Sequence, residues 1–400
     1  MKKLIFLLLM LCLTVSASAV TFRDSDAIRH PDAVTIMTDL GLVNGFEDGT
    51  FRPGQNLRRA QAAKLISLVR AEHPAGSTAG FGDVPVNHWA APYIGFCVRE
   101  NIISGGKAFR PDDFVTGREF AKMLLVCLGY DGSRYTGANW ADAVDADAGA
   151  SGIYNGLDFD LGRIISRDEV CLMLYNAMQG YAVDHVENGR PVYVVDDLMN
   201  PVTYMEHRFH IVKFSGILTG NDFADLTVKD SRLPDGTSKL EGHMPFRLST
   251  PYTMLGRTIE FYAVRTDYGY TPIGLPSLAP GEEAFVATSI DGYTTVLRYS
   301  PYKTSRTTEY YYNGNRSDEG FLGQILDDCS ITGIDRDGDR MIDVIVAMDF
   351  RNGAFTSLEP LTVSAGGNTL PARVLDGSAV TPKLGEVVRC FSMSGMYYIP

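Results

Sequence analysis

The stretch Gly45-Phe46-Glu47-Asp48-Gly49-Thr50-Phe51-Arg52-Pro53, followed by Leu57-Arg58-Arg59-Ala60-Gln61, decides the fold of the first half of this chain. A related stretch reads Phe109-Arg110-Pro111 and then Val115-Thr116-Gly117-Arg118-Glu119. A shorter third copy is Ile165-Ser166-Arg167-Asp168-Glu169. Matched segments of this kind predict a repeat architecture, in which each unit buries its apolar face against its neighbours.

Each copy opens a predicted helix with an apolar stripe on one face. The three stripes are Ala62, Leu65, Ile66 and Val69; Phe120, Met123, Leu124 and Cys127; and Val170, Met173, Leu174 and Ala177. Thr116 with Glu119, and Ser166 with Glu169, predict capping boxes, in which hydroxyl and carboxylate satisfy the first backbone N–H groups. The first copy departs from this pattern, because Arg58 and Gln61 stand at those two places.

The residue that follows each predicted cap suggests a binding chemistry. It is Arg59 in the first copy, Gly117 in the second and Arg167 in the third. The N-terminus of a helix favours an anion through its free N–H groups and its dipole. An arginine adds a planar fork that matches carboxylate or phosphate. We therefore expect anion-binding sites at Arg59 and Arg167.

These segments resemble the S-layer homology family of bacterial surface proteins. The resemblance covers about residues 22–180 and also includes two Phe-x-Asp pairs, which are Phe22 with Asp24 and Phe81 with Asp83. It implies a pseudo-threefold helical module that binds, without a covalent bond, an anionic and typically pyruvylated secondary cell-wall polysaccharide. It assigns the family's arginine to Arg59 and Arg167. The second repeat has Gly117 at this place, and Arg118 lies one position later, about a third of a turn away.

Two further residues have alternative roles in this interpretation. Asp48 either contacts the glycan directly or bonds its own backbone in the Asp48-Gly49 turn. Trp89 either lies near the sugar, as the resemblance implies for an aromatic residue just before the first helix of a repeat, or packs in the core.

The predicted organisation begins with a signal peptide at residues 1–19. Lys2 and Lys3 precede the apolar run from Leu4 to Leu13, and Ala17-Ser18-Ala19 is typical of a cleavage site. We assign the repeats to residues 20–72, 79–135 and 138–182, the last one degenerate. The predicted location is secreted, in the cell wall or surface layer.

Helical spacing stops near residue 190, and alternation with a period of two begins. Examples are Val192–Val195, Thr258–Val264 and Met341–Met348, and turn signals such as Asp291-Gly292 and Asn313-Gly314 recur. The region also resembles the β-rich tail of some clostridial members of the family. The predicted fold class is therefore a multidomain α + β chain, with an all-α module of three repeats followed by an all-β barrel or sandwich at residues 190–400, in one or two domains.

The composition limits the range of partners. A formal net charge of −12 and a pI near 5.1 argue against nucleic acid and anionic membrane surfaces. No stretch beyond the predicted signal peptide is long and apolar enough to predict a membrane span.

One acidic motif predicts either a calcium site or a hairpin turn. Asp335, Asp337, Asp339 and Asp343 have the spacing of a calcium loop. Arg340 and Val346 stand where a complete loop would have glycine and glutamate, so a turn between two strands is the alternative. No other cofactor is predicted.

The sequence contains no Gly-x-Ser-x-Gly, His-Glu-x-x-His, Walker or Rossmann motif. The favoured hypothesis is therefore a wall-anchored surface protein with a β-rich display region and no enzymatic activity. The alternatives are a wall-anchored polysaccharide hydrolase and a self-assembling surface-layer protein whose strand edges make the contacts.

Overall fold

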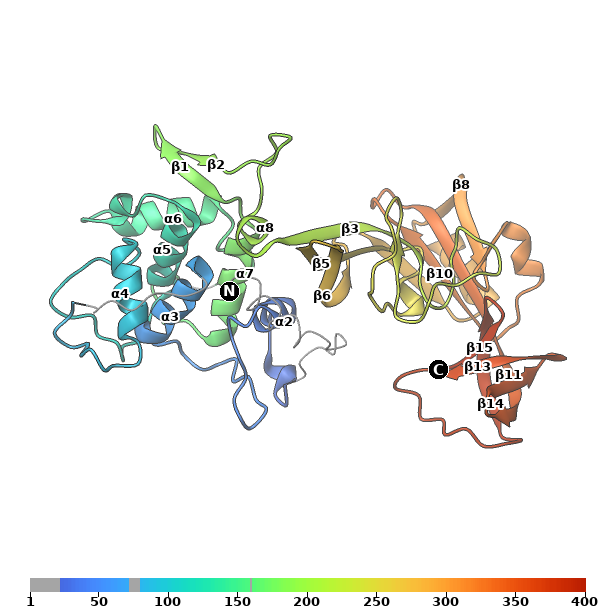
Figure 1. Cartoon of the computed structure of the whole chain (residues 1–400). Coiled ribbons are helices and arrows are strands. Elements are labelled where there is room, and N and C mark those ends of the chain that lie inside the picture. Colours follow the sequence, from blue (N-terminus) through green and yellow to red (C-terminus); the bar gives the residue numbers. More distant parts are fainter. Residues whose placement is uncertain (1–21, 72–79, 159) are drawn as a thin grey trace. The chain divides into compact units, whose positions relative to one another are not determined.

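The computed structural model describes residues 22–71, 80–158 and 160–400, so the predicted signal peptide lies outside the described residues (Figure 1). The chain divides into two compact units. Unit 1 comprises Met1–Val212 with Val264–Gly269 and Ile273–Leu275, and unit 2 comprises Lys213–Ala263, Tyr270–Pro272 and Pro276–Pro400.

The helices of unit 1 occur as three successive pairs and one additional helix. The pairs are α2 (Pro31–Asp39) with α3 (Arg59–Arg70), α4 (Ala91–Arg99) with α5 (Gly117–Leu128), and α6 (Trp140–Ala150) with α7 (Arg167–Gln179). Helix α8 (Tyr204–Phe209) follows them. The predicted stripes face the core, since Ile66, Leu124 and Leu174 are at most 1% exposed.

A ring of three backbone hydrogen bonds joins the pairs around a pseudo-threefold axis. The N–H of Leu57 donates to the carbonyl of Ile165 (3.1 Å), that of Ile165 to Val115 (3.3 Å), and that of Val115 to Leu57 (3.0 Å). All three side chains are buried. The ring places the beginnings of α3, α5 and α7 next to one another, and thereby positions every residue that follows a cap.

The prediction of an all-α module is wrong, because the segments that enter these helices are extended and paired. Isolated β-bridges join Asn56 to Ser166, Arg58 to Phe114, and Thr116 to Ile164. The physical reason is that an N-cap residue has β-region dihedral angles. Thr116 (φ −87°, ψ 162°) and Ser166 (φ −89°, ψ 166°) therefore cap a helix and pair with a neighbouring segment at the same time.

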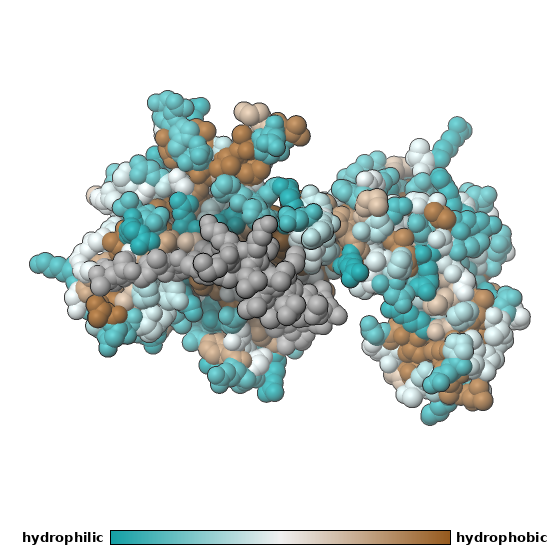
Figure 2. All heavy atoms as spheres, viewed as in Figure 1, coloured by the Kyte–Doolittle hydropathy of each residue, from teal (hydrophilic) through white to brown (hydrophobic). Residues whose placement is uncertain are grey.

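A hairpin of β1 (Val183–Glu187) and β2 (Arg190–Tyr193) adds further β-structure to unit 1. The segment that follows exposes apolar side chains, and Figure 2 shows brown atoms over this part of the unit. Leu198 is 80% exposed and Met199 is 75% exposed. Among the described residues, no helix combines the length and apolar character that crossing a bilayer requires.

The remaining strands form two sheets. One has the order β4-β3-β5-β6, with β3 (Ile211–Gly220), β4 (Lys239–Leu240), β5 (Thr258–Thr266) and β6 (Gly269–Leu278). The other has nine strands: β7 (Glu283–Ala287), β8 (Lys303–Tyr312), β9 (Asn315–Ser317), β10 (Cys329–Asp335), β11 (Met341–Leu358), β12 (Leu361–Ala365), β13 (Asn368–Val374), β14 (Val387–Met393) and β15 (Met396–Ile399).

Strand β11 organises the larger sheet, because it pairs with β8, β10, β12 and β14. Its second half closes a ring of strands in the order β11-β12-β13-β15-β14. A separate apolar cluster, which includes Phe355, Val363 and Tyr397, fills this ring.

The prediction of an all-β second half is also wrong, because α9 (Ile290–Tyr299) lies within it. The hydroxyl of Ser289 caps this helix by accepting from the N–H of Gly292 (3.0 Å). Asp291-Gly292, which predicted a turn, therefore lies in the first turn of a helix. By contrast, the predicted Asn313-Gly314 turn is confirmed between β8 and β9, with φ values of 51° and 80°.

Candidate functional site

The first candidate site is a pocket of about 380 Å³ at the N-terminus of α3, which we call the Arg59 site. Arg59 lines it together with residues from the turn before α5, from α5 itself, from the 3-10 helix Gly132–Tyr135 and from the beginning of α6. These residues include Phe109, Glu119, Lys122, Tyr135 and Trp140. The pocket therefore combines two cationic side chains, one carboxylate and several aromatic rings, which is a surface suited to an anionic sugar.

Hydrogen bonds fix the guanidinium of Arg59 within this pocket. Its Nε donates to the carbonyl of Phe109 (3.0 Å), and its Nη1 donates to Oε1 of Glu119 (3.1 Å). The Phe109 turn is itself held by Asp83, whose carboxylate accepts from the N–H groups of Phe109 (2.8 Å) and Arg110 (2.7 Å). The Phe-x-Asp motif thus positions the carbonyl that orients the arginine.

Arg167 occupies the equivalent place at the N-terminus of α7, which we call the Arg167 site. Its Nε donates to the carbonyl of Phe51 (3.0 Å), and its Nη2 donates to the carbonyl of Asn44 (2.9 Å). The rings of Phe51 and Phe46 lie 4.7 and 5.1 Å from the guanidinium carbon. Burial lowers the pKa of Arg167, and no ion pair to it is found in the described part of the chain.

The repeat adds three residues to these sites that the sequence analysis did not predict, which are Lys64, Lys122 and Trp140, whereas Trp89 was already predicted. Equivalent backbone bonds end α2, α4 and α6, with Leu42, Ile102 and Ile153 donating to Met37, Cys97 and Ala148. Counting back equally from these carbonyls places Arg29, Trp89 and Trp140 at one position of the repeat. Counting on equally from Arg59, Gly117 and Arg167 places Lys64, Lys122 and Leu172 at another. An alignment of the repeats on both helices would have shown these equivalences.

The third equivalent position, at Gly117, lacks the arginine, the lysine and the tryptophan of the other two. Glycine replaces the arginine, Leu172 the lysine and Arg29 the tryptophan. Arg118 turns away and pairs with Asp145, with Nη2–Oδ2 and Nε–Oδ1 distances of 2.7 and 2.9 Å. Arg118 therefore does not occupy the position that Arg59 and Arg167 occupy in their repeats. Its role in glycan binding stays a prediction.

Two other predicted residues, Asp48 and Trp89, make no contact among the described residues that defines a role in binding. Asp48 organises its own turn, accepting from the N–H and hydroxyl of Thr50 (3.0 and 2.6 Å) and from Arg52 (2.9 Å). Trp89 is 54% exposed and stacks on His88 at 5.7 Å. Its exposed ring is available to a ligand, and glycan contact by either residue stays a prediction.

A network of ion pairs joins the first repeat to the third. Glu169 is buried and pairs with Arg163 (2.6 Å) and Arg29 (2.8 Å), while Asp168 lies 3.6 Å from Arg29. Burial alone would raise the pKa of Glu169. The bonds from Arg163, from the Ser166 backbone and from Arg29 outweigh it and lower this pKa to about 2.

We therefore expect unit 1 to lose the stabilisation that Glu169 provides when the pH becomes acidic. A carboxyl group with a lowered pKa stabilises the folded state above its unfolded pKa, and this contribution disappears as pH falls from about 4.5 through about 2. The contribution should be ~2–3 kcal/mol.

Both tryptophans, Trp89 and Trp140, lie in unit 1, so tryptophan fluorescence during urea unfolding measures this unit. Glu169→Gln should lose stability at neutral pH and show a flatter profile in acid; identical profiles would refute this assignment.

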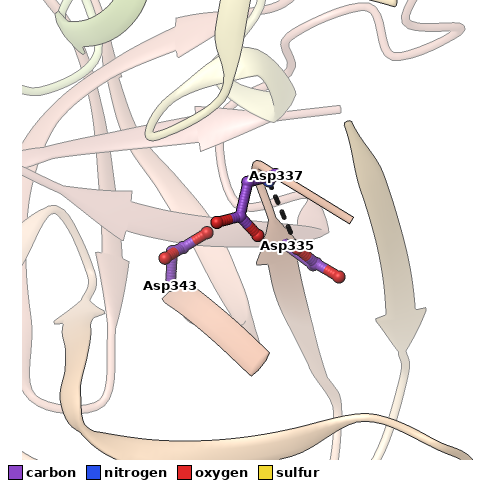
Figure 3. A group of neighbouring side chains, drawn as sticks. All are labelled: Asp335, Asp337 and Asp343. Atoms are coloured by element: carbon purple, nitrogen blue, oxygen red, sulfur yellow. Dashed lines mark hydrogen bonds between the residues drawn. The ribbon is translucent and has the colours of Figure 1, made fainter. Parts of the chain in front are cut away.

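The acidic motif forms the turn between β10 and β11 (Figure 3). Asp335, Asp337 and Asp343 each offer an oxygen within 4.8 Å of the others, while Asp339 is not part of this group. The two oxygens of Asp335 accept from the N–H groups of Gly338 (2.8 Å) and Arg340 (2.7 Å). The hairpin turn is confirmed, and calcium binding stays a prediction.

We expect Asp335→Ala to weaken this hairpin. Asp335 is 1% exposed, and its removal leaves backbone donors without their acceptor, at a cost of about 2 kcal/mol. Hydrogen exchange at the amides of Gly338 and Arg340 should accelerate correspondingly. Asp339→Ala is the matched control, because its carboxylate is exposed and, within the described turn, accepts one hydrogen bond, from the N–H of Met341 (2.7 Å). Equal acceleration in both variants would contradict the assignment.

Two segments, residues 21–63 and 80–121, match the sequence profile of the S-layer homology domain. This match confirms the predicted resemblance. Together with the relatives below, it shows that these two segments are similar to the S-layer homology repeats of bacterial surface proteins, and it confirms the predicted location at the cell wall surface.

Three similar proteins illustrate the range of these relatives. A "Cell surface protein" of Thermoanaerobacter kivui is 27% identical over 202 residues, which are 47% of this chain and 26% of the relative. A "Surface layer protein" of Brevibacillus choshinensis is 30% identical over 146 residues (33% and 13%). A "Cellulosome-anchoring protein" of Acetivibrio thermocellus is 35% identical over 93 residues (22% and 21%). The chain thus spans about a quarter or less of the length of these relatives.

Proposed function

We propose that this protein attaches to an anionic, pyruvylated secondary polysaccharide of the cell wall through the Arg59 and Arg167 sites, and that residues 190–400 form a display region rather than a catalytic domain. The polysaccharide's carboxylates bind the guanidinium groups, and its sugar rings pack on the aromatic side chains. The similarity to a protein named for anchoring supports a role in attachment.

The observation that carries this proposal is the environment of Arg167. Its guanidinium is partly buried between the rings of Phe46 and Phe51, and its hydrogen bonds in the described structure are to two carbonyl oxygens. A partly desolvated cation without a counter-ion is destabilising, unless an anion binds beside it. A sugar carboxylate would supply that charge, and the aromatic rings would pack against its pyranose face.

Selective removal of the polysaccharide from isolated walls tests the proposal. Purified full-length protein without its signal peptide should sediment with walls that retain the polysaccharide. It should remain in solution when mild acid has removed the polysaccharide and left peptidoglycan intact. Equal sedimentation with both preparations would show that peptidoglycan, and not the anionic polymer, is the partner.

The proposed absence of catalysis has its own measurement. The full chain is incubated with cell walls, and soluble reducing sugars and free amino groups are assayed over time. We expect neither to rise above the level of a heat-inactivated sample. Release of either product would assign a hydrolytic activity to residues 190–400 and favour the wall-hydrolase hypothesis.

A further inference from the structure

The Arg59 and Arg167 sites are built on the same frame. The backbone N–H of Arg59 donates to the backbone carbonyl of Asp113 (2.8 Å), and that of Arg167 donates to the backbone carbonyl of Gln55 (2.9 Å). In both sites the guanidinium Nε donates to a phenylalanine carbonyl at 3.0 Å. A residue-by-residue comparison of the two sites is therefore justified.

The two sites share their basic and aromatic positions. Lys122 and Trp140 line the Arg59 site, and the repeat places Lys64 and Trp89 at the equivalent positions of the Arg167 site. The two sites differ in charge at the third residue of the neighbouring helix, which completes the helix cap. This residue is Glu119 beside Arg59, and it is Gln61 at the equivalent position beside Arg167.

This single difference alters the electrostatics of the sites. Glu119 pairs with Arg59 at 3.1 Å, and both side chains are partly buried, with exposures of 32% and 19%. An anion that binds Arg59 must therefore share the guanidinium with an existing carboxylate, and it meets repulsion from that carboxylate. Gln61 carries no charge, and Arg167 has no ion pair within the described ranges.

We infer that Glu119 and Gln61 are specificity-determining residues that make the two sites unequal, so that anionic glycan fills the Arg167 site first and the Arg59 site only at higher concentration. This inference rests on the proposed function. Glu119 competes with the ligand for Arg59, whereas Gln61 leaves Arg167 open to the ligand.

The fold permits an exchange of these two residues. Gln61 Oε1 accepts from the N–H of Arg58 (2.9 Å), and Glu119 Oε2 accepts from the N–H of Thr116 (3.1 Å). Glutamine and glutamate therefore perform the same capping bond in this module. Glu119→Gln and Gln61→Glu consequently alter the charge of a site without removing its helix cap.

The experiment measures each site alone by calorimetric titration with a monosaccharide that carries a pyruvate ketal. Full-length Arg167→Ala protein retains the Arg59 site, and full-length Arg59→Ala protein retains the Arg167 site. Adding Glu119→Gln to the first should tighten binding about tenfold, and adding Gln61→Glu to the second should weaken it about tenfold, as expected for one partly buried ion pair. Glu187→Gln, an exposed charge change on β1, controls for net charge.

The possible results separate the two proposals. If wild-type protein fails to bind the probe, or both arginine variants bind it unchanged, the proposed function fails and this inference fails with it. If each arginine variant loses one of the two sites, but the added Glu119→Gln and Gln61→Glu changes do not shift the dissociation constants of the remaining sites in opposite directions, this inference alone is wrong. Unfolding monitored by tryptophan fluorescence confirms that each variant is folded.

Discussion

Arg167→Ala is expected to lower the affinity of the protein for its wall polysaccharide by about 10- to 100-fold, which corresponds to the loss of one charge-assisted contact to arginine. Arg59→Ala should have a smaller effect, because Glu119 already engages that guanidinium at 3.1 Å. Sedimentation with isolated walls across a range of protein concentrations measures both. Combining the two substitutions should release the protein almost completely.

Two variants control for charge and for shape. Arg58→Ala removes an exposed arginine from the adjacent N-cap, whose side chain pairs with the Asp112 carboxylate (3.4 Å) and donates to the Asp112 carbonyl (2.7 Å). It should retain wild-type affinity. Arg167→Lys keeps the charge but loses the planar fork, so it should recover only part of the affinity. If Arg58→Ala weakened binding as much as Arg167→Ala, general charge rather than a defined site would explain attachment.

Ile165→Ala is expected to produce the largest loss of stability in unit 1. Ile165 is completely buried and lies on the pseudo-threefold axis, where its N–H and carbonyl bond to Val115 and Leu57. Removing the side chain leaves a cavity among all three repeats at a cost of about 3 kcal/mol. Urea unfolding followed by tryptophan fluorescence measures the change.

The neighbouring Ile164 provides the matched control. It is 40% exposed, so Ile164→Ala should change the free energy of unfolding by less than about 0.5 kcal/mol. Because Arg167 lies two residues beyond Ile165, the buried substitution should also weaken wall binding at urea concentrations that leave the control folded. Equal destabilisation by both substitutions would show that the axis does not hold the module together.

Local signals predicted the helix starts of unit 1 well. The Thr116–Glu119 and Ser166–Glu169 capping boxes are present, with N–H to carboxylate distances of 3.1 and 2.9 Å. Local signals did not predict that the same capping segments pair across the axis, because that pairing depends on residues distant in sequence. The same limit explains α9, where a capping serine was compatible with the turn that Asp291-Gly292 suggested.

The sequence predicted the two arginines of the candidate sites and Trp89, but not the other residues around them. Arg59 and Arg167 follow caps that are visible in a short window of sequence. Lys122 and Trp140 come from different repeats and meet Arg59 only after the three pairs assemble. Glu119 was predicted as a capping residue, and its second role as the ion-pair partner of Arg59 depends on the same assembly.

The most direct test of the account follows the arginine side chains themselves during binding. Nitrogen-15 NMR resolves the Nε–H groups of folded arginines, and single substitutions assign those of Arg59 and Arg167. Titration with a monosaccharide that carries a pyruvate ketal should shift the Arg167 signal first and the Arg59 signal at higher concentration. Binding that shifts the signals of exposed arginines such as Arg99, and leaves the Arg59 and Arg167 signals unchanged, would contradict the proposed binding sites.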